Sequence, residues 1–133
     1  MLYLDKQAII GINKQVTSFY GQPHVILAEA NLEHFLEQTI HYAKSIEDEG
    51  ERLFKKAAFL LYHLAFDAHA FADGNKRTAL LSTAAFLAMN SYYLSLDGDE
   101  KQVEQARIMK ETAEGKTSIN FLAKWLKENS TKG

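Results

Sequence analysis

The sequence predicts an all-α domain, a compact bundle of about six helices with a small β-hairpin flap near the N-terminus. Apolar residues recur at spacings of three and four along most of the chain, which is the period of an amphipathic helix. The chain contains a single proline, and no low-complexity tract or internal repeat interrupts it. Its 133 residues, 47% of them hydrophobic, suffice for one core, so we expect one domain over residues 1–133.

The N-terminal part predicts two helices separated by an extended segment. Asp5 can cap the first helix, and Gly21 can end it in the left-handed conformation. The apolar stripe of this helix consists of Ile9, Ile12, Val16, Phe19 and Tyr20. Residues 22–27 break the helical period and carry β-branched side chains, so we expect them to be extended or to form a small hairpin. Asn31 can cap the second helix, which ends before the acidic break at residues 47–50.

The rest of the chain predicts the remaining helices. Residues 53–68 and 78–89 are apolar around most of the helical circumference, which is typical of helices surrounded by others. We expect these two helices to form the centre of the core. A short segment at residues 92–94 precedes a more polar helix over residues 99–113, and Ser118 can cap a last amphipathic helix.

The composition narrows the function classes. The chain has no cysteine, which excludes disulfides and cysteine-based metal sites and makes the cytoplasm the expected compartment. The first residues lack the order of a signal peptide, and no apolar run approaches the roughly 18 residues that would span a bilayer, so we expect no membrane partner. A net charge of -2 with interspersed signs lacks the basic face of a nucleic-acid-binding protein, so we expect no direct nucleic-acid partner.

Polar residues gather in one short segment between the two central helices. This segment contains His69, Asp73, Asn75, Lys76 and Arg77. Burying so many polar and charged groups beside a core is costly unless they are paired or bind a ligand. The segment therefore predicts a ligand site.

The order of the residues indicates which ligand binds there. Gly74 and Asn75 stand directly before the second central helix, and the N-terminus of a helix presents free N–H groups that bind phosphate. Lys76 and Arg77 add positive charge, which is unfavourable at a helix N-terminus unless an anion is also present. These four residues are therefore the predicted nucleotide-binding site.

Two further groups of the segment complete a chemical site. Asp73 is a lone carboxylate, the type of ligand that holds a Mg²⁺ ion bridging phosphates. His69 can take a proton from an attacking hydroxyl near neutral pH. Together these groups predict the transfer of a phosphate-containing group from a nucleotide to a hydroxyl.

Residues 69–80 resemble the motif of the Fic/Doc family, His-x-Phe-x-(Asp/Glu)-(Gly/Ala)-Asn-(Gly/Lys)-Arg, in the form found in its Doc (death-on-curing) toxin branch. Here the motif reads His69-Ala70-Phe71-Ala72-Asp73-Gly74-Asn75-Lys76-Arg77. The chain length and the helix leading into the histidine also resemble that branch. The resemblance implies the Fic fold, with residues 22–27, His24 among them, as a flap to which a target peptide adds as a strand.

The resemblance also implies a role for the motif residues. The residue matching His69 activates the target hydroxyl, the residue matching Asp73 holds Mg²⁺, and the glycine and asparagine that follow it form the anion nest. The residue matching Arg77 contacts phosphate, and the one matching Phe71 anchors the loop in the core.

Lys76 bears on the type of reaction. Fic adenylyltransferases usually carry glycine at this position, whereas Doc-like proteins carry lysine. A lysine side chain would fill the space of the terminal phosphates, and the resemblance implies that ATP or another NTP then binds in reverse and presents its γ-phosphate. This favours phosphorylation, with His69, Lys76 and Arg77 as catalytic residues, over AMP transfer. Ala70 replaces the proline of most Fic motifs, a departure that affects substrate contacts more than the chemistry.

The leading hypothesis is a toxin of a toxin–antitoxin module that phosphorylates a hydroxyl on a protein of the translation machinery and is restrained by an antitoxin protein in trans. Two alternatives stay open: transfer of AMP or another nucleotide, and a catalytically silent Fic-fold binding module.

Residues 45–50 also match an inhibitory string of Fic proteins, (Ser/Thr)-x-x-x-Glu-(Gly/Asn), with Glu49 as the glutamate that would pair with Arg77. So short a pattern is frequent, and it falls at the end of the second predicted helix, so we interpret the match as chance.

Overall fold

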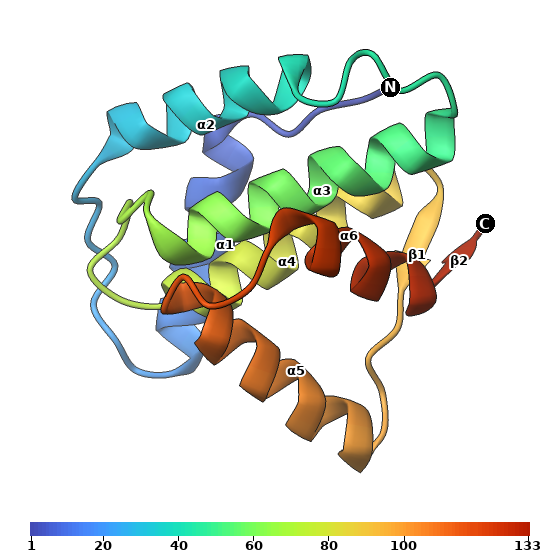
Figure 1. Cartoon of the computed structure of the whole chain (residues 1–133). Helices are drawn as coiled ribbons and strands as arrows, with labels where there is room; N and C mark the ends of the chain where they lie inside the picture. Colours follow the sequence, from blue (N-terminus) through green and yellow to red (C-terminus); the bar gives the residue numbers. More distant parts are fainter.

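The computed structural model describes all 133 residues and contains six helices (Figure 1). In chain order they are α1 (Lys6–Phe19), α2 (Glu29–His41), α3 (Glu49–Phe66), α4 (Asn75–Met89), α5 (Asp99–Ala113) and α6 (Ile119–Glu128). The all-α fold class and the number of helices predicted from the sequence are confirmed. None of the six is both long enough and apolar enough to cross a membrane.

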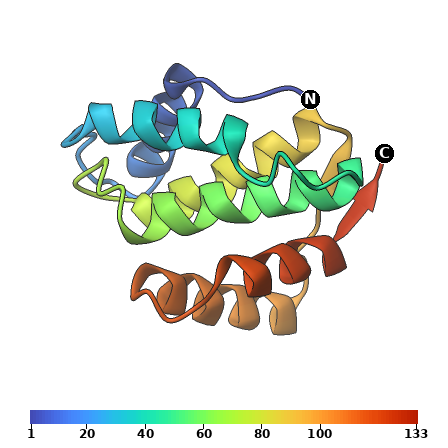
Figure 2. The same ribbon diagram turned by 45° about the horizontal axis from the view of Figure 1, so that its top comes forward.

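Helix α3 lies at the centre of the bundle. It contacts α2, α4, α5 and α6, and the two views show α2 on one side of it and α5 with α6 on the other (Figure 1; Figure 2). Its Ala57, Ala58 and Leu61 are fully buried, and the small alanines let the neighbouring helices approach closely. Helix α4 packs on α3 and on α1 and buries Ala79 and Leu87. The two central helices were therefore predicted correctly.

Two of the predicted helix caps are present. The Asp5 Oδ1 accepts a hydrogen bond from the N–H of Ala8 at 2.9 Å, and the Ser118 Oγ accepts one from the N–H of Phe121 at 3.1 Å. Each satisfies one of the N–H groups that the first turn of a helix leaves without a partner.

The predicted cap at Asn31 is wrong. Helix α2 begins two residues earlier, at Glu29, without a side-chain cap. The side chain of Asn31 instead donates from its Nδ2 to the carbonyl oxygen of Ala68 at 2.7 Å. The side chain of Asn31 thus makes a tertiary contact instead of capping the helix. This contact connects α2 to the chain just before His69.

The predicted apolar stripe of α1 is correct only in its first part. Ile9 and Val16 are buried, but Phe19 is 81% exposed and Tyr20 is 49% exposed. These two rings pack against each other edge to face, with centroids 4.9 Å apart, on the surface beside α4. The helical period continues to the end of α1, whereas the core does not, because no further element covers its last turn.

The protein contains one small antiparallel sheet, formed by β1 (Tyr92–Leu94) and β2 (Ser130–Lys132). Tyr92 lies opposite Lys132, and Leu94 lies opposite Ser130. The chain end is therefore paired to the segment that follows α4, at the end of the bundle where α3 begins (Figure 1).

Residues 22–27 do not form the predicted β-hairpin flap. They are extended, and they make a single bridge, between Ile26 and Phe71. Of the two alternatives predicted for this segment, the extended one is confirmed and the hairpin is not formed, because the partner of the segment is the chain before α4 rather than a neighbouring strand of its own. We call residues 22–27 the extended segment.

Candidate active site

The predicted site residues lie in one loop, residues 67–74, and in the first turn of α4. Ala68, Ala70 and Phe71 are buried at 0%, 2% and 3% exposure, and His69 between them is exposed. His69 has a φ of 45°, in the left-handed region that a residue with a side chain rarely adopts. The buried neighbours hold this conformation and direct the imidazole outward, and such strained residues cluster at functional sites.

The side chain of Asn75 closes the loop. Its Oδ1 accepts a hydrogen bond from the N–H of Phe71 at 3.3 Å, and its Nδ2 donates to the Phe71 carbonyl oxygen at 2.7 Å. The Phe71 ring belongs to the hydrophobic core. Phe71 therefore anchors the loop, and the Asn75 amide holds the loop closed against the start of α4.

The N-terminus of α4 presents free donors. No group of the protein accepts a hydrogen bond from the N–H of Asn75, Lys76 or Arg77, and the helix has no side-chain cap. Gly74 precedes them with a φ of 78°, and a Cβ at this position would lie 3.1 Å from the Cγ1 of Val16. Only glycine fits this turn without strain, and the turn aims three N–H groups outward as a cradle for an anion.

Two cations flank this cradle. Lys76 and Arg77 are exposed, and neither takes part in any of the ion pairs of the protein. The guanidinium carbon of Arg77 lies 4.0 Å from the centroid of the Tyr20 ring, a cation–π contact. Positive charge at a helix N-terminus opposes the helix dipole, so the arrangement favours binding of a negatively charged group.

Asp73 directly precedes Gly74 in the same turn. It is partly exposed, and its carboxylate accepts no hydrogen bond from the protein, whereas its backbone oxygen accepts one from the Nδ2 of Asn13 at 2.9 Å. A Mg²⁺ ion in a nucleotide site is held by one or two carboxylates together with phosphate oxygens and water. One free carboxylate next to an anion cradle fits that ion.

The match to known proteins agrees with this geometry. The sequence model described as the Fic/DOC family matches residues 3–87, a span that includes α1 to α3 and the whole loop. The chain belongs to the Fic/DOC family. Toxin Doc of Mycolicibacterium smegmatis is 40% identical to it over 76 residues, which are 57% of this chain and 56% of that protein. The chain thus matches about half the length of this relative.

The extended segment runs along the loop of residues 67–74. The N–H of Ala72 donates to the carbonyl oxygen of Val25 at 3.0 Å, and the N–H of Leu27 donates to the carbonyl oxygen of Ala70 at 2.7 Å. Val25, Ile26 and Leu27 are exposed at 41%, 39% and 63%. The segment therefore lies along the loop that contains His69 and exposes its own side chains, although it forms neither a strand nor a hairpin.

An apolar groove opens next to Arg77, at a position that the sequence did not predict. It has a volume of about 520 Å³ and lies between α1, α4 and α5. Its apolar lining consists of Val16, Phe19, Tyr20, Leu80, Leu81 and Ala106. The exposed rings at the end of α1 were its only signal in the sequence, and the helical period assigned them to the core.

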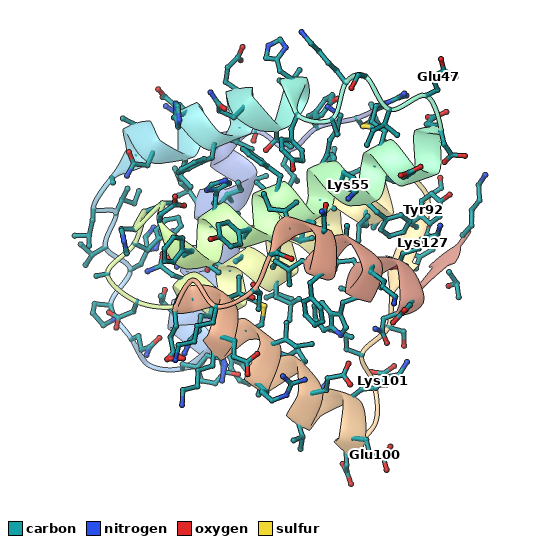
Figure 3. All side chains as sticks on the ribbon, in the orientation of Figure 1. Glu47, Lys55, Tyr92, Glu100, Lys101 and Lys127 are labelled. Carbon is teal, nitrogen blue, oxygen red and sulfur yellow. The ribbon has the colours of Figure 1, made fainter.

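The structure places the inhibitory string far from the loop. Glu49 is the first residue of α3, and His69 follows its last residue, so the length of an 18-residue helix, about 27 Å, separates them. Figure 3 labels the neighbouring Glu47 together with Tyr92 at the end of the bundle opposite the loop. This agrees with the interpretation of residues 45–50 as a chance match.

Proposed function

We propose that the protein is a Doc-like toxin of a toxin–antitoxin module that acts in the cytoplasm and transfers the γ-phosphate of ATP, or of another NTP, to a hydroxyl of a target protein. The observation that carries the proposal is the set of three free N–H groups at the start of α4, flanked by Lys76 and Arg77 and preceded in the same loop by an unpaired carboxylate and an exposed histidine. This is the set of groups that phosphoryl transfer requires.

In the proposed reaction, the target hydroxyl oxygen attacks the γ-phosphorus of the nucleotide. The bond from that phosphorus to the β–γ bridging oxygen breaks, and the nucleoside diphosphate leaves. His69 takes the hydroxyl proton and later releases it to water. The N–H groups of α4 and the side chains of Lys76 and Arg77 stabilise the charge on the transferred group. Asp73 would hold Mg²⁺, which supplies further neutralisation of phosphate charge.

Lys76 distinguishes phosphoryl transfer from AMP transfer. It occupies the second position of α4, and its side chain is exposed and free of ion pairs. In AMP transfer the hydroxyl would attack the α-phosphorus and pyrophosphate would leave, which requires room for two terminal phosphates. Lys76→Gly would provide that room, so this substitution should abolish phosphoryl transfer if our proposal holds and should leave or raise AMP transfer if the alternative holds.

Two surfaces support the proposed protein partners. The outer edge of the extended segment is exposed, so a peptide of the target, for which we propose a protein of the translation machinery, can add there as a strand. The groove beside Arg77 is apolar, and a segment of an antitoxin protein supplied in trans would cover Phe19 and Tyr20. An antitoxin in this groove would also reach Arg77, which offers a direct route to inhibition.

The test uses the purified protein and its His69→Ala variant with magnesium and a bacterial lysate, with ATP labelled in parallel at the γ- or the α-phosphate. We expect His69-dependent transfer of label to a protein from the γ-position only. Label from the α-position would make the protein an AMP transferase. Labelling that does not depend on His69, or no labelling from either position, would favour a silent binding module.

A further inference from the structure

One buried amide outside the motif holds the loop in place. Asn13 lies on α1, and its side chain is fully buried. Its Nδ2 donates to the backbone oxygen of Asp73 at 2.9 Å and to the Oγ1 of Thr78 at 3.0 Å. These acceptors lie on either side of the glycine turn, so a single side chain of α1 connects the two ends of the anion cradle.

The hydrogen bonds fix both the orientation of this amide and the tautomer of His24. A carbonyl oxygen can only accept, so the atom of Asn13 that faces Asp73 is Nδ2. The Oδ1 of Asn13 is therefore an acceptor, and the Nδ1 of His24, 2.8 Å away, carries the proton.

His24 links this amide to the extended segment. The next residue, Val25, accepts a backbone hydrogen bond from Ala72, and the His24 ring lies 6.2 Å from the Phe71 ring, centroid to centroid. The segment is thus joined to the loop twice, directly through the backbone and indirectly through Asn13. Asn13 and His24, which form the indirect link, both lie outside the sequence motif.

The amide of Asn13 packs closely against the glycine turn. A Cβ on Gly74 would lie 3.3 Å from the Asn13 Nδ2, so the amide is already in contact with the turn. A buried amide with three partners is held more rigidly than a surface side chain, because each partner would be left unpaired if it moved.

We propose that Asn13 is a positioning residue of the active site and that His24 couples the extended segment to it. The chemistry that they serve rests on the proposed function. By holding the Asp73 backbone and the start of α4 together, Asn13 keeps the free carboxylate and the three N–H groups at fixed relative positions. His24 holds the extended segment against the same amide, so the surface offered to a target peptide and the phosphate site share one support.

Asn13→Asp tests the first part. It keeps the size of the side chain but turns the donor that faces the Asp73 oxygen into an acceptor. Ile9→Val is the matched control, since Ile9 is equally buried on α1 and makes none of these hydrogen bonds. We expect amide hydrogen exchange of residues 70–78 to accelerate in Asn13→Asp and not in Ile9→Val. The affinity for Mg²⁺–ATP, measured by titration calorimetry, should fall by about tenfold, as it does when an outer partner of a metal ligand is lost.

A pair of substitutions tests the role of His24. An asparagine amide can place a donor where the imidazole Nδ1 stands, whereas alanine cannot. We expect exchange of residues 25–28 and 70–78 to stay slow in His24→Asn and to accelerate in His24→Ala. Equal exchange in both variants would overturn the coupling by His24.

The outcomes separate this inference from the proposed function. Unchanged exchange and unchanged nucleotide affinity in a folded Asn13→Asp variant would overturn the positioning role. If Asn13→Asp does not fold, Asn13→Ala, which introduces no buried charge, replaces it in the same comparison. If the wild type binds no Mg²⁺–ATP but exchange still accelerates in the Asn13 variant, the positioning role stands and the nucleotide-dependent function fails.

Discussion

The two ends of α3 use cationic side chains in opposite ways. Near its start, Arg52 and Lys56 donate to backbone carbonyl oxygens of residues 46 and 39, at 2.8 and 3.0 Å. Beyond its other end, Lys76 and Arg77 have no anionic partner in the protein. The cations near the start of α3 therefore complete the structure, because carbonyl groups surround them. Those beyond its end are available to a ligand, because free N–H groups surround them.

The helix N-termini at the two ends of α3 also differ in whether their backbone N–H groups are capped. The N-terminus of α3 is capped by Asp48, whose Oδ1 accepts from the N–H of Glu51 at 2.8 Å. The N-terminus of α4 has no cap, and it follows Gly74 and His69, both with positive φ. Of these two helix starts, only the one beside the loop leaves its N–H groups without a side-chain cap, as expected where function rather than stability has selected the residues.

The largest expected effect is at His69. His69→Gly removes the proposed base and also relieves the left-handed conformation. We expect transfer activity to fall by about 10²–10⁴-fold. The free energy of unfolding should rise by about 1 kcal/mol, because glycine adopts positive φ without a steric penalty. Labelled phosphate transfer and urea denaturation measure the two quantities.

The control for His69→Gly is His69→Ala. It should lose the same activity without gaining stability, since alanine is as strained as histidine at positive φ. A His69→Gly variant that is less stable than the wild type would show that the packing of the imidazole outweighs the strain of the positive φ at this residue.

In the N-terminal half of α3, a substitution of Lys56 tests whether this cation stabilises the fold. It is 2% exposed, and its Nζ donates to the carbonyl oxygens of Thr39 and Ile40, in the last turn of α2. Lys56→Met fills similar space but leaves both carbonyl groups without this donor. We expect the free energy of unfolding to fall by about 1 kcal/mol and labelled phosphate transfer by the folded variant to be unchanged. A loss of transfer would mean that the two ends are not separate.

Lys56 also predicts a dependence of stability on pH. Burial lowers the pKa of Lys56 in the folded protein below the ordinary lysine value, and the nearby charge of Arg52 lowers it further. The unfolded chain therefore binds the proton up to a higher pH than the folded protein does. Between the two values the stability of the wild type should rise with pH relative to Lys56→Met. Urea unfolding of both proteins at about pH 7 and about pH 10 measures the free energy of unfolding of the wild type relative to that of Lys56→Met. A relative stability of the wild type that falls between these pH values would contradict the prediction.

A smaller effect is expected where α1 meets the site. Tyr20→Leu keeps an apolar side chain in the groove but removes the cation–π contact with Arg77. We expect a loss of about 0.5–1 kcal/mol in the free energy of unfolding, the usual value of such a contact at an exposed site. Phe19→Leu, on the same turn and without a cation, is the control. Equal losses in the two variants would mean that the Arg77 contact contributes nothing beyond apolar packing.

The features that could be predicted from the sequence depend on residues close together in the chain. The helix caps at Asp5 and Ser118 and the apolar circumference of the two central helices are local signals. The loop could be predicted as a site for the same reason, because residues 69–77 supply its histidine, carboxylate, cations and helix start without help from elsewhere.

The features that could not be predicted depend on contacts between distant segments. Asn13 lies 60 residues from Asp73, and no local pattern marks a buried amide of α1 as the support of the loop. The extended conformation of residues 22–27 could be predicted, but their pairing with residues 70–72 could not, because it crosses most of the N-terminal half of the chain. Phe19 and Tyr20 follow the helical period, but the period says nothing of where the core ends.

The smallest expected effect tests whether the two ends of α3 are independent. Glu49→Ala removes an exposed carboxylate from the first turn of α3, at a cost of about 0.3–1 kcal/mol through the helix dipole. Labelled phosphate transfer should be unchanged, because the length of α3 separates Glu49 from Arg77. Glu51→Ala is the control, since Glu51 lies in the same turn but is not the glutamate of the inhibitory string. A rise in transfer that is specific to Glu49→Ala would require this glutamate to reach Arg77 of a second molecule, because α3 is a continuous rigid helix within one chain. Such a rise would replace the independence of the two ends with inhibition between copies.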